Sequence, residues 1–178
     1  MKFSFLTKIF SIILVLLLMN SITFSKVKSF SWKDFKYCDL SFNNSKMKII
    51  KKFGKPKQNV PEYECGNYAT GKKNPDYYQL IYKDIICIGN DKEGFIFESI
   101  ILNDNNYIMI GDYRISNKTS KNEFIKHFND LLLTYYSKEE LLNREVIQLF
   151  SKDTDDCAEF YFKNGKVFKF TTSIEKCN

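Results

Sequence analysis

The sequence has little of what enzymes and nucleic-acid-binding proteins use. It contains one histidine, and its seven glycines are scattered singly instead of forming a phosphate-binding loop. Arginine occurs only at Arg114 and Arg144, and the lysines are dispersed among acidic residues, so no basic face for nucleic acid is indicated. No G-x-S-x-G or H-E-x-x-H motif is present. We therefore expect a non-enzymatic protein with no cofactor and no nucleic-acid partner.

Residues 1–25 have the pattern of a secretory signal peptide. Two lysines begin it, residues 9–19 form an apolar run, and Thr23 and Ser25 are small residues at −3 and −1 of a cut before Lys26. The run is too short to span a bilayer, which favours cleavage over retention as an anchor. Removing two lysines lowers the net charge from +6 to +4. We expect an exported protein, periplasmic or secreted, without a stable membrane span after cleavage.

All five cysteines lie beyond this segment, as is usual for an oxidising compartment. None belongs to a C-x-x-C pair, so zinc and thioredoxin-type sites lack their spacing. We predict one disulfide in each half of the chain, Cys65–Cys87 and Cys157–Cys177, with Cys38 left over. Spacing alone leaves other connectivities open.

A segment near the start of the exported chain recurs 75 positions later. Leu40–Phe53 reads LSFNNSKMKIIKKF, and Ile115–Phe128 reads ISNKTSKNEFIKHF. Six of the fourteen aligned positions are identical: Ser41/Ser116, Ser45/Ser120, Lys46/Lys121, Ile50/Ile125, Lys51/Lys126 and Phe53/Phe128.

Both copies have the features of a short amphipathic helix. Ser45 and Ser120 are cap-type residues ahead of an apolar stripe, and Ser120 with Glu123 fits a capping box. Gly54 predicts the end of the first helix. Runs of β-branched and aromatic residues follow each copy and predict strands. These runs are Pro61–Cys65, Tyr77–Tyr82, Ile85–Ile88, Phe95–Leu102, Leu131–Tyr136, Glu145–Phe150, Ala158–Phe162 and Val167–Thr172.

The pattern predicts an α+β fold of two tandem units, each a helix followed by antiparallel strands. The units span residues 37–110 and 111–178, after a lead-in of residues 26–36. Within the last hairpin, a three-residue loop ending at Gly165 would pair Phe160 with Phe168 and keep apolar and charged side chains on separate faces.

A capped helix ending in FGKP and followed by strands resembles the small α+β units of the SmpA/OmlA outer-membrane lipoproteins. It also resembles the tandem β-lactamase-inhibitor-protein fold, and exported bacterial proteins in which FG-x-P precedes a tyrosine-rich strand. The chain lacks the lipidation cysteine of the lipoproteins. The resemblance implies a tandem fold that binds instead of catalysing, and it transfers no active site.

Three groups of polar residues were considered for chemistry. His127 is expected at the half-exposed edge of the second helix. Asn103–Asn106 is expected to form an Asx-rich turn. Asp153–Asp156 is the densest carboxylate run, and it supports the alternative function, an envelope hydrolase.

The preferred function is binding of another protein in the envelope or outside the cell, in the manner of an inhibitor or immunity factor. Adjacent tyrosines on a strand point to opposite faces, so one of each pair is expected to face outward, where tyrosine favours protein contacts. The loop Gly66–Pro75 is the longest polar stretch. The predicted binding residues are Tyr68, Lys72, Lys73, Tyr77, Tyr78, Tyr135 and Tyr136.

Overall fold

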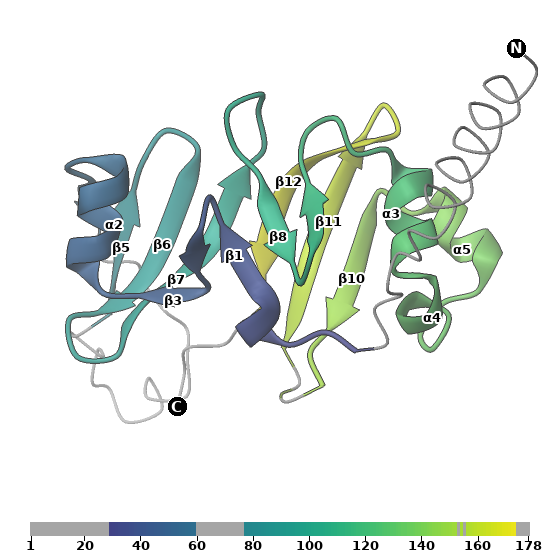
Figure 1. Ribbon diagram of the computed structural model, residues 1–178, viewed down its shortest axis with the longest axis horizontal. Coiled ribbons are helices and arrows are strands. Elements are labelled where there is room, and N and C mark those ends of the chain that lie inside the picture. Colours follow the sequence, from purple (N-terminus) through teal and green to yellow (C-terminus); the bar gives the residue numbers. More distant parts are fainter. Residues whose placement is uncertain (1–28, 60–76, 153, 155, 174–178) are drawn as a thin grey trace, which may run out of the picture.

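A computed structural model describes residues 29–59, 77–152, 154 and 156–173 (Figure 1). Among these residues the strands predominate, the helices are short and the sheets are antiparallel, which confirms the predicted α+β class. The helical elements are η1 (Trp32–Asp34), α2 (Lys46–Phe53), α3 (Lys121–His127), α4 (Asn129–Leu132) and α5 (Lys138–Asn143).

The larger sheet has eight strands, and its main path runs β10-β11-β12-β7-β6-β5-β4, with β3 added on β7. The last of the described strands, β12, therefore lies in the middle of the sheet, where Phe170 is paired with Phe160 of β11 and Ile100 of β7. The strands are β3 (Asn43–Asn44), β4 (Lys57–Asn59), β5 (Tyr78–Ile81), β6 (Ile85–Asn90), β7 (Gly94–Ile101), β10 (Val146–Phe150), β11 (Cys157–Lys163) and β12 (Lys166–Thr172).

A smaller sheet in the order β2-β1-β8-β9 lies against the middle of the larger one. Its strands are β1 (Phe35–Tyr37), β2 (Leu40–Ser41), β8 (Ile108–Ile110) and β9 (Tyr113–Ile115). Phe35 joins the two sheets, because its ring centroid lies 6.5 Å from that of Phe97 and 5.0 Å from that of Phe170. Burying one such ring contributes about 1.5–3 kcal/mol to folding, so the aromatic side chains between the sheets dominate the core.

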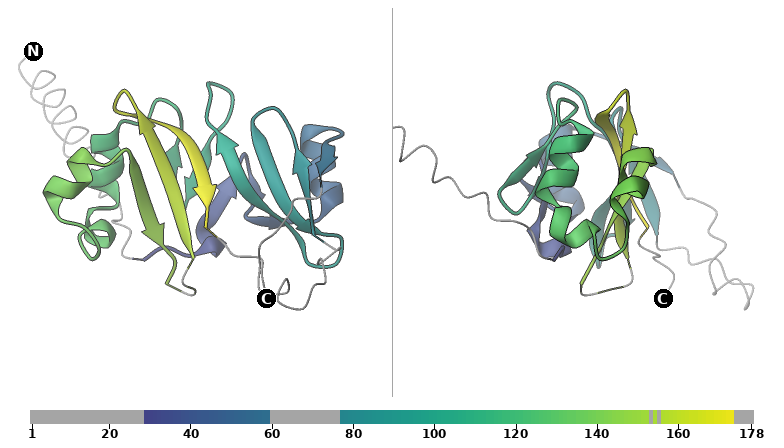
Figure 2. Two further views of the ribbon diagram at one scale, coloured as in Figure 1. Left: turned by 180° about the vertical axis from the view of Figure 1, so that it is seen from behind. Right: turned by 90° about the vertical axis from the view of Figure 1, so that its right-hand side faces the viewer.

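The helices extend this core at its two ends. At one end, Phe53 of α2 contacts Tyr37 and Tyr82, and at the other, Phe124 of α3 contacts Phe160 and Phe162. Figure 1 shows α2, the smaller sheet and α3 in front of the larger sheet. Figure 2 shows the reverse view, in which none of the described elements covers the back of the larger sheet.

Both predicted helices are present, and local interactions explain their ends. At the start of α3 the Ser120 side chain accepts a hydrogen bond from the Glu123 backbone N–H, and the Glu123 carboxylate accepts one from the Ser120 N–H, which confirms the capping box. Ser45 makes no such side-chain bond at the start of α2. Gly54 ends α2 with φ +85° and donates its N–H to the Ile50 carbonyl, as predicted.

Two predictions for the second half are wrong. Leu131–Tyr136 is not a strand: its first residues belong to α4, in which both Leu131 and Leu132 are buried. In the last hairpin, Asn164 and Gly165 form a two-residue turn with φ +52° and +71°. The predicted strand Pro61–Cys65 lies outside the described residues.

The register of that hairpin also differs from the prediction. Lys163 pairs with Lys166 across the two-residue turn, and a bulge then makes Phe160 pair with Phe170 instead of Phe168. The bulge restores the separation of faces that a plain two-residue turn would lose. As a result Phe168 leaves the core and is 37% exposed.

Candidate binding sites

A hydrogen-bonded network occupies the uncovered face of the larger sheet over β10, β11 and β12. The Glu159 carboxylate is its centre and accepts hydrogen bonds from the side chains of Gln148, Tyr161 and Thr171, each at 2.9 Å. Tyr136, which follows α4, donates its hydroxyl to Gln148 at 3.2 Å and so extends the network past the sheet edge. Cross-strand pairing places these groups in one row, because Glu159 lies opposite Gln148 and Thr171.

Glu159 is held in its charged form. Burial alone would raise its pKa, but the hydrogen bonds from Gln148, Thr171 and Tyr161, together with the positive charge of Lys169, lower the pKa of this carboxyl below its usual range. A carboxylate with all its neighbours donating to it is an anchor for fixed side-chain positions. It is poorly suited to act as a general base, since its lone pairs already accept these hydrogen bonds.

Exposed apolar and cationic groups lie beside this network. Ile101 is 48% exposed and pairs with Lys169, whose ammonium group lies 5.0 Å from the centre of the Tyr161 ring. The ring of Phe168 contacts Tyr161 edge-on, with centroids 6.4 Å apart. Farther along, the Arg144 guanidinium lies 4.7 Å from the centre of the Tyr136 ring. We call Ile101, Tyr136, Arg144, Glu159, Tyr161, Phe168 and Lys169 the sheet-face cluster.

The predicted tyrosine surface is divided between the two ends of the larger sheet. Tyr77 is buried, with its hydroxyl on Glu93, and Tyr78 is half-buried, with its hydroxyl accepting a hydrogen bond from Lys46 at 2.9 Å. At the other end, Tyr135 is 52% exposed against Phe150. Only Tyr136 of the predicted residues joins the sheet-face cluster. Tyr68, Lys72 and Lys73 lie outside the described residues.

An open pocket of about 570 Å³ lies beside α3. A single stretch of chain forms it: the end of β9, the turn at residues 116–119, and the exposed side of α3. Its lining residues are Tyr113, Arg114, Ser116, Lys118, Thr119, Glu123, Lys126 and His127. This volume is in the usual range for sites of small molecules, roughly 300–1,000 Å³.

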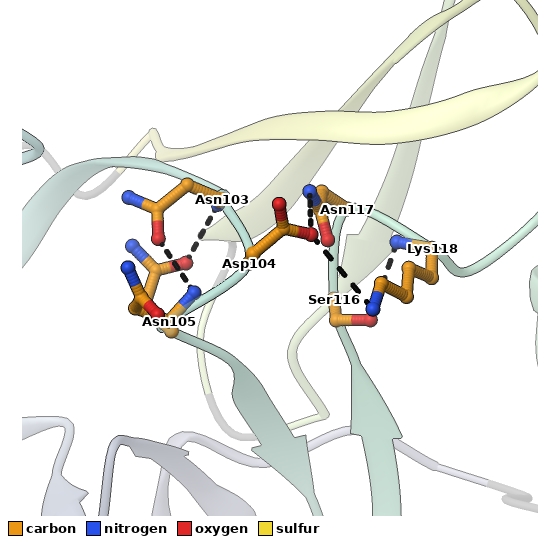
Figure 3. Close-up of polar contacts among 7 residues, drawn as sticks. Asn103, Asp104, Asn105, Ser116, Asn117 and Lys118 are labelled. Carbon is orange, nitrogen blue, oxygen red and sulfur yellow. Dashed lines mark hydrogen bonds and ion pairs between the residues drawn. The ribbon is translucent and has the colours of Figure 1, made fainter.

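Hydrogen bonds fix the turn that supplies part of this pocket (Figure 3). Asp104, in the Asn103–Asn106 turn, accepts a hydrogen bond from the Asn117 side-chain amide at 3.1 Å and lies 3.9 Å from the Lys118 ammonium. The Asn103 side chain accepts a hydrogen bond from the Asn105 backbone N–H, which confirms that this stretch forms an Asx turn. The two turns that flank β8 and β9 are thereby held together.

His127 is buried, not half-exposed as expected, and only 8% of it is accessible. Its ring is stacked on Tyr113 of β9, and its Nε2 atom is buried without a hydrogen-bond partner. Burial lowers the pKa of this imidazole, although Asp112 opposes the effect. The neutral ring is therefore favoured at pH 7, and it packs as an aromatic side chain.

The cysteines that the structure describes are Cys38, Cys87 and Cys157, and each is a free thiol. Cys87 is fully buried, and burial raises the pKa of its thiol to about 12, which makes it a poor nucleophile. The predicted partners Cys65 and Cys177 lie outside the described residues, and both disulfides stay predictions for the protein after export to an oxidising compartment.

The remaining polar candidates offer little chemistry in the part of the chain that the structure describes. Asp153 and Asp155 lie outside the described residues. The backbone carbonyl of Asp156 accepts a hydrogen bond from the Ser151 N–H. Over the described ranges no group of three or more His, Cys, Asp or Glu side chains is placed to hold a metal ion. None of the described helices combines the length and the apolarity needed to cross a bilayer.

No protein-family model, curated protein or solved structure matches the chain.

Proposed function

We propose that the protein is an exported, non-enzymatic module that binds another protein through the sheet-face cluster, in the manner of an inhibitor or immunity factor. The observation that carries the proposal is the composition of that uncovered face. It combines exposed Phe168 and Ile101 with tyrosines and with the cations Arg144 and Lys169. Aromatic residues and arginine are enriched in protein interfaces and supply most of their binding energy.

The fixed positions of these side chains also favour binding. Tyr136 and Tyr161 have their hydroxyls fixed by Gln148 and Glu159, so they lose little freedom when a partner covers them. Immobilising a mobile side chain on binding costs about 0.5–1.5 kcal/mol, and a network that is already formed avoids part of this cost. The two cations, exposed Arg144 and half-buried Lys169, lead us to expect a partner that presents carboxylates around an apolar contact.

The tandem organisation is part of the proposal. The backbone pairing of the residues that precede α2 and α3 supports it. Just before α2, Asn44 pairs with Phe95, the residue after Gly94. Just before α3, Ser120 bridges Lys166, the residue after Gly165. Both glycines have positive φ. Gly94 is the first residue of β7, Gly165 immediately precedes β12, and these two strands pair with each other in the larger sheet. Two copies of one unit, joined through β7 and β12, would give this arrangement.

Export rests on the signal-peptide pattern of residues 1–25 and the use of cysteine. N-terminal sequencing of the protein from expressing cells tests it directly. We expect the sequence to begin at Lys26 and the protein to fractionate with the periplasm or the medium. Recovery of an uncleaved chain in the cytoplasm would contradict this part of the proposal.

The binding surface is tested by recovering partners from a cell-envelope extract with the tagged protein and identifying them by mass spectrometry. A real partner should then lose affinity about thirtyfold or more when a central apolar contact is removed, as for an interface hot spot of about 2 kcal/mol. Phe168→Ser and Ile101→Ser are the test variants, because both side chains are exposed and neither is in the core.

Met47→Ser is the matched control. This side chain is 80% exposed and lies on α2, at the opposite end of the molecule from β10, β11 and β12. The control should bind as the wild type does. Equal loss in the test and control variants, or a partner indifferent to all three, would refute the sheet-face cluster as the docking surface.

A further inference from the structure

The pocket beside α3 has an excess of positive charge. Three of its lining side chains, Arg114, Lys118 and Lys126, are cations, and all three are exposed. Its one carboxylate, Glu123, accepts hydrogen bonds from the backbone N–H and the hydroxyl of Ser120, at 2.9 and 2.7 Å. That carboxylate is therefore committed to capping α3 and is not oriented to neutralise the cations.

The cations have few competing partners among the described residues. Lys118 lies 3.9 Å from Asp104, and both side chains are more than 70% exposed, so water weakens this pair. The Arg114 guanidinium lies over the Tyr107 ring, at 4.0 Å from its centre, which orients the group without cancelling its charge. An anion entering the pocket would meet charge that the protein has not already satisfied.

Aromatic side chains form the inner wall of the pocket. The rings of Tyr113 and His127 are parallel within 11° and their centroids lie 3.8 Å apart. The Nε2 atom of His127 is buried and unpartnered, and so is Oδ1 of Asn117 in the adjoining turn. Leaving such atoms unpaired costs free energy and is rare in native proteins, so two of them beside one pocket call for an explanation.

We infer that this pocket binds a small amphipathic anion. Its apolar body would lie along the Tyr113–His127 stack, and its carboxylate or phosphate group would pair with Arg114, Lys118 and Lys126. Pockets for small ligands combine an apolar wall with a few charged groups that fix orientation in this way. The site is separate from the sheet-face cluster, and the inference does not depend on the proposed protein partner.

His127 provides the test, because a chain with one histidine gives one set of imidazole signals in a proton NMR spectrum. Octanoate and octyl phosphate are titrated separately to distinguish the two head groups. Octanol, which lacks the anionic group, and inorganic phosphate, which lacks the apolar chain, are the comparison probes. We expect at least one of the amphipathic anions to shift the His127 signal saturably. Octanol and inorganic phosphate should bind at least tenfold more weakly, since each lacks contacts worth about 1.4 kcal/mol or more.

The charge requirement is tested with Lys126→Gln, which should weaken binding of the anion about tenfold, as for loss of one charged contact. The control is Lys51→Gln, because Lys51 aligns with Lys126 in the repeated segment and both side chains are exposed. The control should bind as the wild type does. Absence of saturation with both anions, octanol binding as tightly as octanoate, or equal affinity in the two variants would overturn the inference.

Discussion

The imidazole of His127 lies flat against the ring of Tyr113, with the centroids 3.8 Å apart. This contact joins α3 to β9, which is an edge strand of the smaller sheet. The same ring contacts Phe128 edge-on at 4.9 Å. The only histidine of the chain thus serves as an aromatic packing residue, and its protonation would place a charge inside an aromatic cluster.

Acidification should therefore destabilise the protein through His127. Burial lowers the pKa of this imidazole in the folded state, whereas an unfolded chain has a histidine pKa of about 6.5. The unfolded state then binds the proton more readily, so this contribution to stability is present above about pH 6.5 and is lost as the pH falls below it. Urea unfolding at pH 7 and pH 5 measures the loss.

His127→Phe supplies the comparison, because it keeps a ring on Tyr113 but does not titrate. Its stability should depend less on pH over the same interval. An NMR titration of the wild type adds a direct check: a measured pKa of His127 at or above 6.5 would contradict the prediction.

The two aligned helices offer a matched pair of cap variants. Ser120→Ala should lower the free energy of unfolding by about 1 kcal/mol, because it removes the hydrogen bond to the Glu123 backbone N–H. Ser45→Ala should change it by only a few tenths of a kcal/mol, since Ser45 makes no side-chain cap bond. Urea unfolding at pH 7 compares them. Equal losses in the two variants would show that the capping box does not stabilise α3.

Gly89 is required by close packing in the β6–β7 hairpin. A Cβ atom at this position would overlap the backbone carbonyl of Gly94, which cannot move without breaking the ladder. Gly89→Ala should therefore cost about 1–3 kcal/mol of stability, as overpacking does. Gly111→Asn is the control, because Gly111 has φ +61° and open space around it, and asparagine tolerates this conformation. Thermal unfolding should show the loss in the first variant alone.

The predicted disulfides are open to peptide mapping under non-reducing conditions. Cys157 has its sulfur 3.0 Å from the Ser173 hydroxyl, and only three residues separate Ser173 from Cys177 in the sequence. We expect cross-linked peptides for Cys157–Cys177 and for Cys65–Cys87, with Cys38 recovered as a thiol from protein exported to an oxidising compartment. Any other pairing, or five free thiols in exported protein, would contradict the prediction.

Local signals in the sequence predicted the local structure well. Helix α3 and its cap follow from Ser120 and Glu123 alone, and the end of α2 follows from Gly54. Leu131–Tyr136 was mistaken for a strand because its residue types fit both a strand and a buried turn of helix, and tertiary packing selected the helix. The bulge that turns Phe168 outward is likewise set by contacts with β7, which no local pattern contains.

The candidate sites differ in the same way, because one is formed by local sequence and the other by the pairing of distant strands. The pocket beside α3 comes from one stretch of chain, so its signal is present in the sequence: the cations Arg114, Lys118 and Lys126 lie near the single histidine. The sheet-face cluster could not be predicted from local sequence patterns, because it forms only when β12 lies between β11 and β7. Strands of two or three residues in the smaller sheet gave too little periodicity to predict their pairing.

The central place of β12 has a consequence for the order in which the chain folds. A ribosome or a translocase delivers residues from the N-terminus, yet the pairs of Ser99, Ile100 and Ile101 arrive only with residues 169–171. Contacts this distant in sequence are slow to form. The N-terminal half must therefore wait, with one flank of β7 still open, until the end of the chain closes it.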